Sequence, residues 1–450
     1  MMKRILSSIL AIILLLSMCC VSAAEDNTWT ADMESKHYIL NQLGIVEIEG
    51  AVPYVTLTGD AQQVLSYMVS DEHTDFKDIS KSAFVNFLCN IIGNYGFNDQ
   101  ANDEAIEIAE GYGIIHKGQD DLYKSLTYEE ALTMLVRLLG YGEHAEMGGG
   151  FPQGYISIAT RLGLNKGITA GVGENLKVHE AITLLYNAIN CAYVEIMWFT
   201  NEEIVYGDTS DKTLLYEFRK IYRIEGVVEA TGTAALSDSK AVGAQQTMID
   251  GYIYNTNVDL TDMLGLEVEA YVQEDSKNGD VVLFVFPHKN NKQLTITDEN
   301  IIAVSEDFRQ ISYYDKNDRK KEAVISPIAK VLYNGQPLAK YTEDKFKPED
   351  GSIMLIENDG STGYDIVHIQ SFKTVVVGSV SPSNLTVGNA YSYDENNQII
   401  NLEAKTDDVI RIFDAEGKET EISALLPGDV LRVAESAGSS RRTVTVYVSS

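Results

Sequence analysis

Residues 105–139 read AIEIAEGYGIIHKGQDDLYKSLTYEEALTMLVRLL, and this stretch decides the fold of the first half of the chain. Apolar residues recur at intervals of three and four on both sides of a polar loop, which predicts two amphipathic helices. The first helix ends at Gly113, where glycine can adopt the left-handed conformation that closes a helix. Thr127 followed by Glu130 is typical of a capping box at the start of the second helix.

This pattern of helix, glycine, short extended stretch and helix occurs three times between residues 36 and 195. The first helices end near Gly44, Gly113 and Gly163, and the second helices cover residues 83–92, 130–139 and 180–189. One helix pair cannot bury its apolar face alone, whereas three stacked pairs can. We therefore expect residues 36–195 to form one all-α unit of three repeats, with an insertion near residues 51–75.

From about residue 222 the pattern changes to the alternation of apolar and polar residues that predicts strands. Residues 201–221 are expected to connect the two halves, partly as a short helix. Three β domains are expected at residues 222–290, 293–374 and 375–450, the first and third sharing a layout of strand, polar turn and strand. The predicted fold class is therefore α+β and multidomain: an N-terminal all-α three-repeat unit followed by tandem small β-barrels or β-sandwiches.

The N-terminus has the layout of a secretory signal peptide. Lys3 and Arg4 precede a short apolar run, and small residues follow at positions 21–24, so residues 1–24 are expected to be removed on export. Cleavage after Ala23 and a lipoprotein signal at Cys19 are the alternatives. No later segment is apolar enough over sufficient length to predict a transmembrane anchor.

Cleavage would leave Cys89 and Cys191 as the remaining cysteines. Two cysteines in a chain of this length do not make a disulfide framework. Both lie in apolar helical runs, which favours two buried small hydrophobic side chains. A bridge between them stays open at this point.

The chain has 35 lysines and arginines against 66 aspartates and glutamates, a formal net charge of -31. This balance argues against nucleic acid as a partner, because phosphate binding needs a basic surface. No metal, dinucleotide, P-loop or nucleophile motif occurs in the sequence. We therefore expect no enzyme activity, no catalytic residues, no metal and no cofactor. Residues 357–365 resemble a calcium loop in outline, but a hairpin turn is the preferred interpretation because carboxylates are few.

Two stretches of the helical half resemble S-layer homology repeats. Residues 113–118 look like the family's Gly-Ile-Val-x-Gly core, and residues 126–131 match the start of its second helix, usually Ile-Thr-Arg-Ala-Glu. Residues 149–167, continued by 176–189, are similar to the third repeat of clostridial members, and residues 76–79 are a faint copy of the Phe-x-Asp-Val motif. Farther along, residues 333–335 and 351–360 look like the region downstream of the repeats in such proteins.

The resemblance implies non-covalent attachment to a secondary cell-wall polysaccharide, on the surface of a Gram-positive-type bacterium. It implies other surface-layer proteins as a further class of partner. In the family, an arginine of the Thr-Arg-Ala-Glu motif contributes to the polymer groove, and its fork suits an anionic sugar. Here the three arginine positions hold Lys81, Tyr128 and Val178. The implied polysaccharide-binding residues are Lys81, His116, Lys117, Gly118, Tyr128 and Glu130, with most of the charge attraction expected from Lys81.

These patterns support three functional interpretations. The first is an exported, wall-anchored structural protein of the S-layer type. The second is a secreted carbohydrate-active enzyme or binding module in which the helical half is only an anchor, and the third is a helical half that binds another protein. A pocket in residues 222–450 that gathers carboxylates or aromatic side chains would favour the second. For the 116–118 loop an ordinary exposed turn, and for Glu130 a helix-capping acid, stay open as alternatives.

Overall fold

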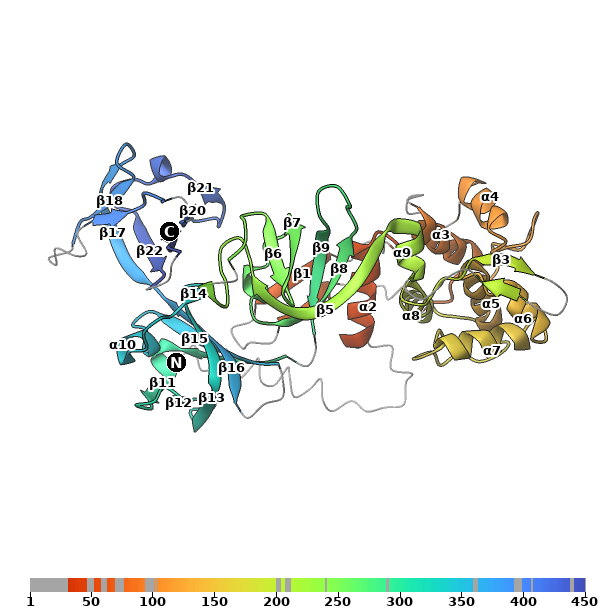
Figure 1. Ribbon diagram of the computed structural model, residues 1–450, viewed down its shortest axis with the longest axis horizontal. Helices are drawn as coiled ribbons and strands as arrows, with labels where there is room; N and C mark the ends of the chain where they lie inside the picture. Colours follow the sequence, from red (N-terminus) through yellow and green to blue (C-terminus); the bar gives the residue numbers. More distant parts are fainter. Residues whose placement is uncertain are drawn as a thin grey trace, which may run out of the picture. The chain divides into compact units, whose positions relative to one another are not determined.

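The computed structural model describes most of the chain in two compact units (Figure 1). The described residues are 31–46, 52–57, 63–68, 77–93, 101, 103–199, 204–206, 212–238, 241–288, 291–358, 363–391, 399–405, 408–437 and 441–449. The first unit comprises Met1–Tyr54 and Tyr67–Asp208, and the second comprises Val55–Ser66 and Thr209–Ser450. The expected signal peptide, residues 1–24, lies outside the described residues.

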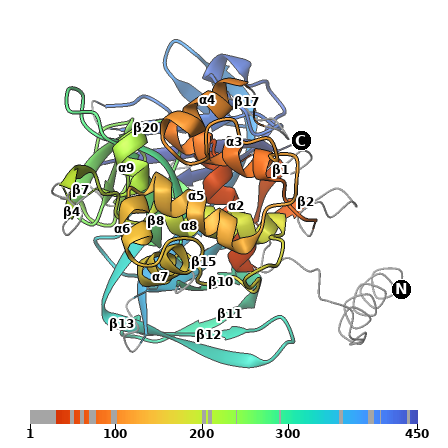
Figure 2. The ribbon, with the colours of Figure 1, turned by 90° about the vertical axis from the view of Figure 1, so that its right-hand side faces the viewer.

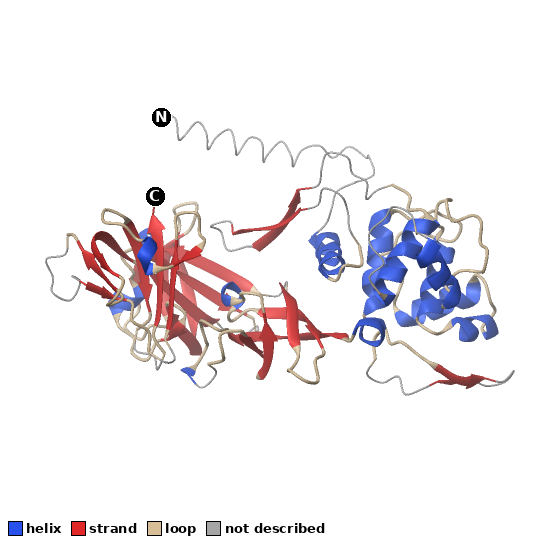
Figure 3. Cartoon of the chain, turned by 90° about the horizontal axis from the view of Figure 1, so that it is seen from above, coloured by secondary structure: helices blue, strands red, loops and turns tan. Residues whose placement is uncertain are grey.

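The first unit contains most of the described helices (Figure 3). They are α2 (Ala31–Gln42), α3 (Lys81–Ile92), α4 (Asp103–Gly111), α5 (Tyr128–Leu138), α6 (Gly142–Met147), α7 (Gln153–Leu162) and α8 (Val178–Ile189). Two short strand pairs are also described, β1 (Val52–Leu57) with β2 (Gln63–Met68) and β3 (Ile196–Phe199) with β4 (Ile204–Tyr206). The helices are short, with 12 residues in α3 and in α8.

Three extended segments meet at the centre of this unit, each directly before a helix. The Ile79 N–H donates to the Leu176 carbonyl at 3.0 Å, the Leu176 N–H to Leu126 at 2.8 Å, and the Leu126 N–H to Ile79 at 2.8 Å. These three side chains are buried. The bonds form a closed ring that satisfies buried backbone groups outside any sheet and fixes the starts of α3, α5 and α8 beside one another.

The helices pack in pairs that differ from the expected ones. Helix α3 packs against α4, α5 against α7, and α2 against α8. The sequence pattern predicts instead that α2 pairs with α3, α4 with α5 and α7 with α8. The first two observed pairs are joined by shorter connections than the predicted ones, as is usual for elements that pack together. The third pair brings together the first and last described helices of the unit.

The second unit begins with α9 (Leu214–Arg219) and a closed five-stranded barrel. The barrel strands are β5 (Ile221–Ala230), β6 (Gln246–Ile249), β7 (Tyr252–Thr256), β8 (Glu267–Gln273) and β9 (Val281–Pro287), in the order β5-β6-β7-β9-β8. A short 3₁₀ helix, Thr261–Met263, lies between β7 and β8. Leu332, Ile356 and Ile366 of the next sheet belong to the barrel's hydrophobic cluster, so the two regions share one core.

Two open sheets of seven strands come after the barrel. The middle sheet contains β10 (Lys292–Thr297), β11 (Ile301–Val304), β12 (Gln310–Tyr314), β13 (Lys320–Tyr333), β14 (Gln336–Pro337), β15 (Gly351–Glu357) and β16 (Tyr364–Ser371), with α10 (Glu343–Phe346) between β14 and β15. The C-terminal sheet contains β17 (Lys373–Ser381), β18 (Thr386–Asn389), β19 (Ile399–Asn401), β20 (Val409–Phe413), β21 (Glu419–Thr420), β22 (Val430–Glu435) and β23 (Thr443–Ser449). The long β12–β13 hairpin is visible in Figure 2.

One strand connectivity occurs in all three β regions. A late antiparallel hairpin (β8–β9, β15–β16 or β22–β23) places its second strand parallel to an earlier strand (β7, β13 or β20). The first strand of each hairpin pairs antiparallel with the first strand of its region (β5, β10 or β17). The barrel closes because β5 also pairs with β6, β6 pairs with β7, and β7 leads back to β9, whereas the other two regions stay open.

The predicted fold class is wrong in both halves. The chain is β-rich, the N-terminal unit includes the strand pair β3–β4 and an additional short helix, and its described residues do not form an all-α unit of three stacked helix pairs. The second half is not a row of small barrels or sandwiches, because one region closes and two form open mixed sheets. Alternation along a strand identifies its buried face but not which strands pair, so the sequence could not separate a barrel from an open sheet.

Gly140 provides a test of the packing in the first unit. Its φ is +86°, and a Cβ there would lie 1.9 Å from the Val194 carbonyl oxygen. Gly140→Ala should therefore lower the free energy of unfolding by more than about 2 kcal/mol, because left-handed strain and a backbone clash combine. Gly173→Ala is the matched control, since its φ is +84° with nothing within 4 Å. It should cost about 1 kcal/mol.

Urea unfolding followed by tryptophan fluorescence measures both variants, because Trp198 of β3 belongs to the first unit. Equal losses in the two variants would show that contact with Val194 does not constrain position 140.

His37 gives the first unit a pH-dependent stability. The side chain is 3% exposed in α2, and burial lowers its pKa from 6.5 to about 4. Between pH 6.5 and 4 the unfolded chain therefore binds a proton that the folded unit does not, so stability falls as the pH falls through this window. The full loss is about 3 kcal/mol.

Hydrogen exchange of α2 and α8, corrected for the intrinsic pH dependence, should show faster opening at about pH 4.5 than at about pH 7. His37→Gln should remove most of this dependence, whereas His116→Gln, at an exposed position, should retain it. An unchanged pH dependence in His37→Gln would refute the assignment.

Candidate functional site

Glu130, one of the predicted site residues, lies in the first turn of α5. Glu130 Oε2 accepts a hydrogen bond from the Thr127 N–H at 3.1 Å, so the glutamate half of the predicted capping box is present. In α8, Glu180 Oε2 accepts from the Lys177 N–H at 3.2 Å in the same way. Both glutamates therefore serve as helix-capping acids, which is the alternative that the sequence left open for Glu130.

Lys81 is held between two carboxylates. Its Nζ lies 2.5 Å from Asp121 Oδ2 and 2.7 Å from Glu130 Oε1, and its side chain is only 5% exposed. Burial alone would lower the pKa of Lys81, but the two hydrogen bonds and the two negative charges outweigh it and raise this pKa. The charge of Lys81 is thus already balanced inside the protein.

Tyr128 occupies the first turn of α5 and is buried. Its hydroxyl accepts a hydrogen bond from Asn165 Nδ2 at 3.3 Å, and its N–H donates to the Glu174 carbonyl at 3.0 Å. A sugar could stack on this ring only after the surrounding side chains moved. Val178 lies at the equivalent position of α8, where its N–H donates to the Lys77 carbonyl.

His116, Lys117 and Gly118 form an exposed loop. Gly118 has a φ of +71°, and its N–H donates to Glu110 Oε1 at 2.6 Å, which closes the loop onto α4. His116 Nε2 lies 3.5 Å from the Arg137 guanidinium. The loop therefore presents a lysine and a histidine beside an arginine.

Arg137 was missed by the sequence analysis. Its Nε donates to the Tyr155 hydroxyl at 3.2 Å, the guanidinium lies 5.4 Å from the centre of that ring, and the Tyr155 hydroxyl donates to Glu146 at 2.7 Å. Arg137 lies about two turns after Glu130 on the same helix, which is the one signal that could have located it.

The structure joins Lys81 to Glu130 and His116 to Arg137. Among the described residues, no hydrogen bond or ion pair links these two groups to each other. Polysaccharide binding by the six predicted residues stays a prediction.

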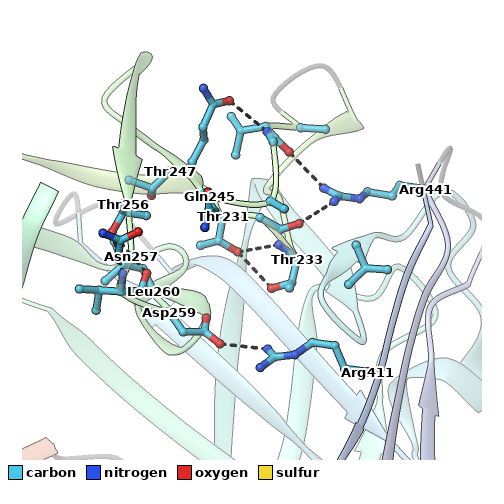
Figure 4. A pocket seen from close by; sticks show the side chains of 18 of the residues that line it. Thr231, Thr233, Gln245, Thr247, Thr256, Asn257, Asp259, Leu260, Arg411 and Arg441 are labelled. Carbon is cyan, nitrogen blue, oxygen red and sulfur yellow. Dashed lines mark hydrogen bonds and ion pairs between the residues drawn. The ribbon is translucent and has the colours of Figure 1, made fainter. Parts of the chain in front are cut away.

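The second unit contains a polar cleft with a volume of about 1000 Å³ (Figure 4). The barrel contributes residues 231–233, 241–247 and 256–260, and the C-terminal sheet contributes residues 408–411, Glu419 and Arg441. Threonine hydroxyls and side-chain amides supply about half of the barrel wall, and small apolar residues supply most of the rest. This composition suits a hydroxylated ligand more than an apolar one.

Two arginines of the C-terminal sheet hold the cleft together (Figure 4). Arg411 donates to Asp259 Oδ2 at 3.0 Å and to Glu419 at 3.3 Å. Arg441 donates to the Gly232 carbonyl at 2.5 Å and the Val242 carbonyl at 3.4 Å. Both guanidiniums thus bind groups of the barrel, which fixes the position of the C-terminal sheet beside it.

The carboxylates of this cleft have structural partners. Burial opposes the change, but hydrogen bonds from Thr261 and from Arg411 lower the pKa of Asp259. A hydrogen bond from the Lys405 N–H, together with one from the Arg442 N–H, lowers the pKa of Asp408. A general acid needs a raised pKa, so neither group has the property that glycoside hydrolysis requires of its acid.

The sequence predicted no metal site and no transmembrane anchor, and it left open a bridge between Cys89 and Cys191. Within the described part of the chain, no cluster of histidine, cysteine or acidic residues is arranged to hold a metal. None of the helices described above is long and apolar enough to cross a membrane. Cys89 and Cys191 are both free, and burial raises the pKa of each, to about 12 and about 11.

The predicted hairpin around residues 357–365 is confirmed, because β15 and β16 pair with Ile356 opposite Ile366. Residues 359–362 of the calcium-loop alternative lie outside the described residues.

The chain is similar to a protein of the bacterial cell wall. Over 420 residues it is 23% identical to the middle cell wall protein of Brevibacillus brevis. The alignment covers 81% of this chain but only 36% of that relative, so the chain spans about a third of the relative's length. No protein-family model matches the chain.

The ion pairs of Lys81 provide a test of the predicted site. Lys81→Met leaves Asp121 and Glu130 without their counter-charge, so the first unit should lose about 3–5 kcal/mol of stability. The double variant with Glu130→Gln should recover part of this loss, because one uncompensated charge is removed. Lys117→Met, at an exposed position, should change stability by less than about 0.5 kcal/mol.

Chemical unfolding of the wild type and these three variants measures the differences. A stable Lys81→Met variant would show that the two carboxylates do not depend on this cation.

Proposed function

We propose that this chain is a structural protein of the cell surface, exported and attached non-covalently to a cell-wall polysaccharide through its helical unit. The similarity to a cell wall protein over most of the chain carries this proposal. The S-layer homology resemblance of residues 113–118 and 126–131 supports the mode of attachment.

The exposed cations of the helical unit are the best candidates for contact with an anionic polymer. Lys81 is neutralised by Asp121 and Glu130, so it offers little attraction to a second anion. Lys117 is exposed, and its sequence neighbour His116 lies 3.5 Å from the Arg137 guanidinium. An arginine fork next to a lysine suits a carboxylate on a sugar ring. The attachment surface therefore shifts from Lys81 to the 116–118 loop and Arg137.

We further propose that the chain is not an enzyme. The cleft of the second unit does contain carboxylates, which keeps the alternative of a carbohydrate-active enzyme testable. Asp259 and Glu419 are engaged by the same arginine, and hydrogen bonds lower the pKa of Asp259. These observations favour binding over hydrolysis in this cleft.

Binding to purified Brevibacillus brevis cell walls tests the attachment. The mature chain should sediment with walls that carry their secondary polymer and stay in solution with walls from which it has been extracted. Lys117→Ala and Arg137→Gln should each weaken binding about three- to fivefold at low salt, because one partly exposed charge contributes roughly up to 1 kcal/mol. The difference from wild type should shrink at about 1 M salt.

Lys320→Ala removes an exposed cation of the second unit and is the matched control, with unchanged binding expected. Equal binding to both wall preparations would contradict polysaccharide attachment. A larger effect of Lys81→Ala than of Lys117→Ala, at unchanged stability, would restore Lys81 as the main contact.

A further inference from the structure

The three β regions meet at the side chain of Gln336. This residue is 2% exposed, and its Nε2 donates to the Thr233 carbonyl of the barrel at 2.8 Å and to Thr443 Oγ1 of the C-terminal sheet at 2.9 Å. Asn334, on the same turn, donates to the Glu435 carbonyl of that sheet at 2.8 Å. One turn of the middle sheet therefore fixes the barrel and the C-terminal sheet at the same place.

A second cavity, of about 650 Å³, opens at this junction. One wall is a face of the middle sheet, where Thr295 is aligned with Met354 and His368, and Ser352 with Gln370. The opposite wall is a face of the C-terminal sheet, where Arg411 is aligned with Thr445 and Phe413 with Tyr447.

The two sheet faces that line this cavity carry both polar and apolar side chains. Sheets that pack face to face bury interdigitating apolar side chains about 10 Å apart. Here hydroxyl and amide side chains line part of the space, beside Met354, Ile369 and Val409. Gln293, Thr295, Ser352, Gln370 and Thr445 form no side-chain hydrogen bond with any other part of the chain that the structure describes. A cavity of this size, with a few unpaired polar groups in a partly apolar lining, is within the range of ligand sites.

The barrel supplies the third wall, the turn that contains Asp259 and Asp262. His368 Nε2 donates to the Leu264 carbonyl at 2.9 Å, which holds this turn against the middle sheet. Asp262 has no hydrogen-bond or ion-pair partner among the described residues. Burial, and then the charge of Asp259, raise the pKa of this carboxyl group. A carboxylate so placed can accept two hydroxyl hydrogens of one ligand.

Aromatic rings complete the C-terminal wall. Phe413 and Tyr447 stack with ring centres 5.3 Å apart, and the Arg411 guanidinium lies 4.7 Å from the centre of the Phe413 ring. The stacked rings and this guanidinium all line the cavity.

Asp259 and Arg411 line both this cavity and the cleft of Figure 4, so their ion pair lies on the boundary between the two. An elongated ligand suits two adjoining polar cavities better than a compact one. Among the described residues, Arg411 is the cation that lines this cavity, and it is already paired with Asp259 and Glu419. An anionic ligand would therefore lie next to the Asp262 carboxylate without a free cation, so an anionic ligand is disfavoured.

We propose that the second cavity binds a stretch of neutral saccharide chain, with the Asp262 carboxylate, the Gln370 amide and the Thr445 hydroxyl as its hydrogen-bond partners. A saccharide provides hydroxyl groups that both donate and accept hydrogen bonds. These match the carboxylate, amide and hydroxyl groups of the cavity walls, which between them also donate and accept. This inference goes beyond wall attachment, because it assigns a ligand class to a site in the second unit.

Titration calorimetry on the mature chain tests the proposal with three neutral tetrasaccharides: an N-acetylglucosamine tetramer, cellotetraose and mannotetraose. At least one should bind, and tetragalacturonate, which is anionic, should bind at least about tenfold more weakly. Asp262→Asn and Thr445→Val should each weaken binding about five- to tenfold, because each removes a hydrogen bond while retaining the shape of the side chain.

Asp318→Asn and Thr386→Val are the matched controls, outside both cavities, and should bind within about twofold of wild type. Thermal unfolding of all four variants separates lost binding from lost folding. The proposal is overturned if no neutral tetrasaccharide binds, if binding survives both cavity variants, or if a randomised peptide library binds in a way that Asp262→Asn abolishes. The wall-binding assay with Lys117→Ala tests attachment through the helical unit independently. Saccharide binding in the second cavity and wall attachment can therefore fail separately.

Discussion

Buried backbone N–H and C=O groups need hydrogen-bond partners. In this protein some of these buried groups lie outside helices and sheets, and they must be paired there as well. The ring of Ile79, Leu126 and Leu176 meets this constraint in the first unit, with each N–H donating to a carbonyl of the ring. The three helices that begin after these residues start from one point, so their apolar faces converge on one core. Without the ring, three isolated helix starts would bury unpaired amides at a cost of roughly 1–3 kcal/mol each.

The second unit meets the same constraint with parallel strand pairs and with one side chain. Each β region places the last strand of its hairpin beside an earlier strand in parallel, which pairs its backbone inside the sheet. The turns between regions cannot be paired in this way. Gln336 reaches both neighbouring regions through its side-chain amide, and it is buried for that reason. Polar anchoring at this junction therefore adds to the apolar packing that the barrel shares with the middle sheet.

The local structure could be read from the sequence to a large extent, and the long-range pairing could not. Periodicity located the helix that starts at Tyr128, and Thr127 with Glu130 located its beginning. The hairpin around residues 357–365 was evident from turn chemistry. The helix partners were predicted wrongly. An apolar stripe shows that one face of a helix is buried, but it does not identify the element that covers this face. The same limit explains why one closed barrel and two open sheets were all expected to be small β-barrels or β-sandwiches.

The candidate sites show a related limit. Lys81 was expected to face a ligand because of its position in a motif, yet its partners Asp121 and Glu130 lie 40 and 49 residues away in the sequence. No local pattern reports such a pair. Arg137 could have been noticed as a cation about two turns after Glu130, but its neighbour His116 belongs to another segment. The cavity of Asp262 was beyond reach, since its walls come from three regions that only the fold brings together.

The charge of the chain separates the two proposed binding modes. At a net charge of -31, a long-range repulsion opposes contact with any anionic polymer, and salt screens both this repulsion and the local attraction of Lys117 and Arg137. A neutral saccharide experiences neither effect, because hydrogen bonds to the Gln370 amide and the Thr445 hydroxyl do not depend on a screened charge. Two weak sites with different salt dependences can hold one surface polymer over a wider range of ionic strength than either alone, provided the polymer reaches both.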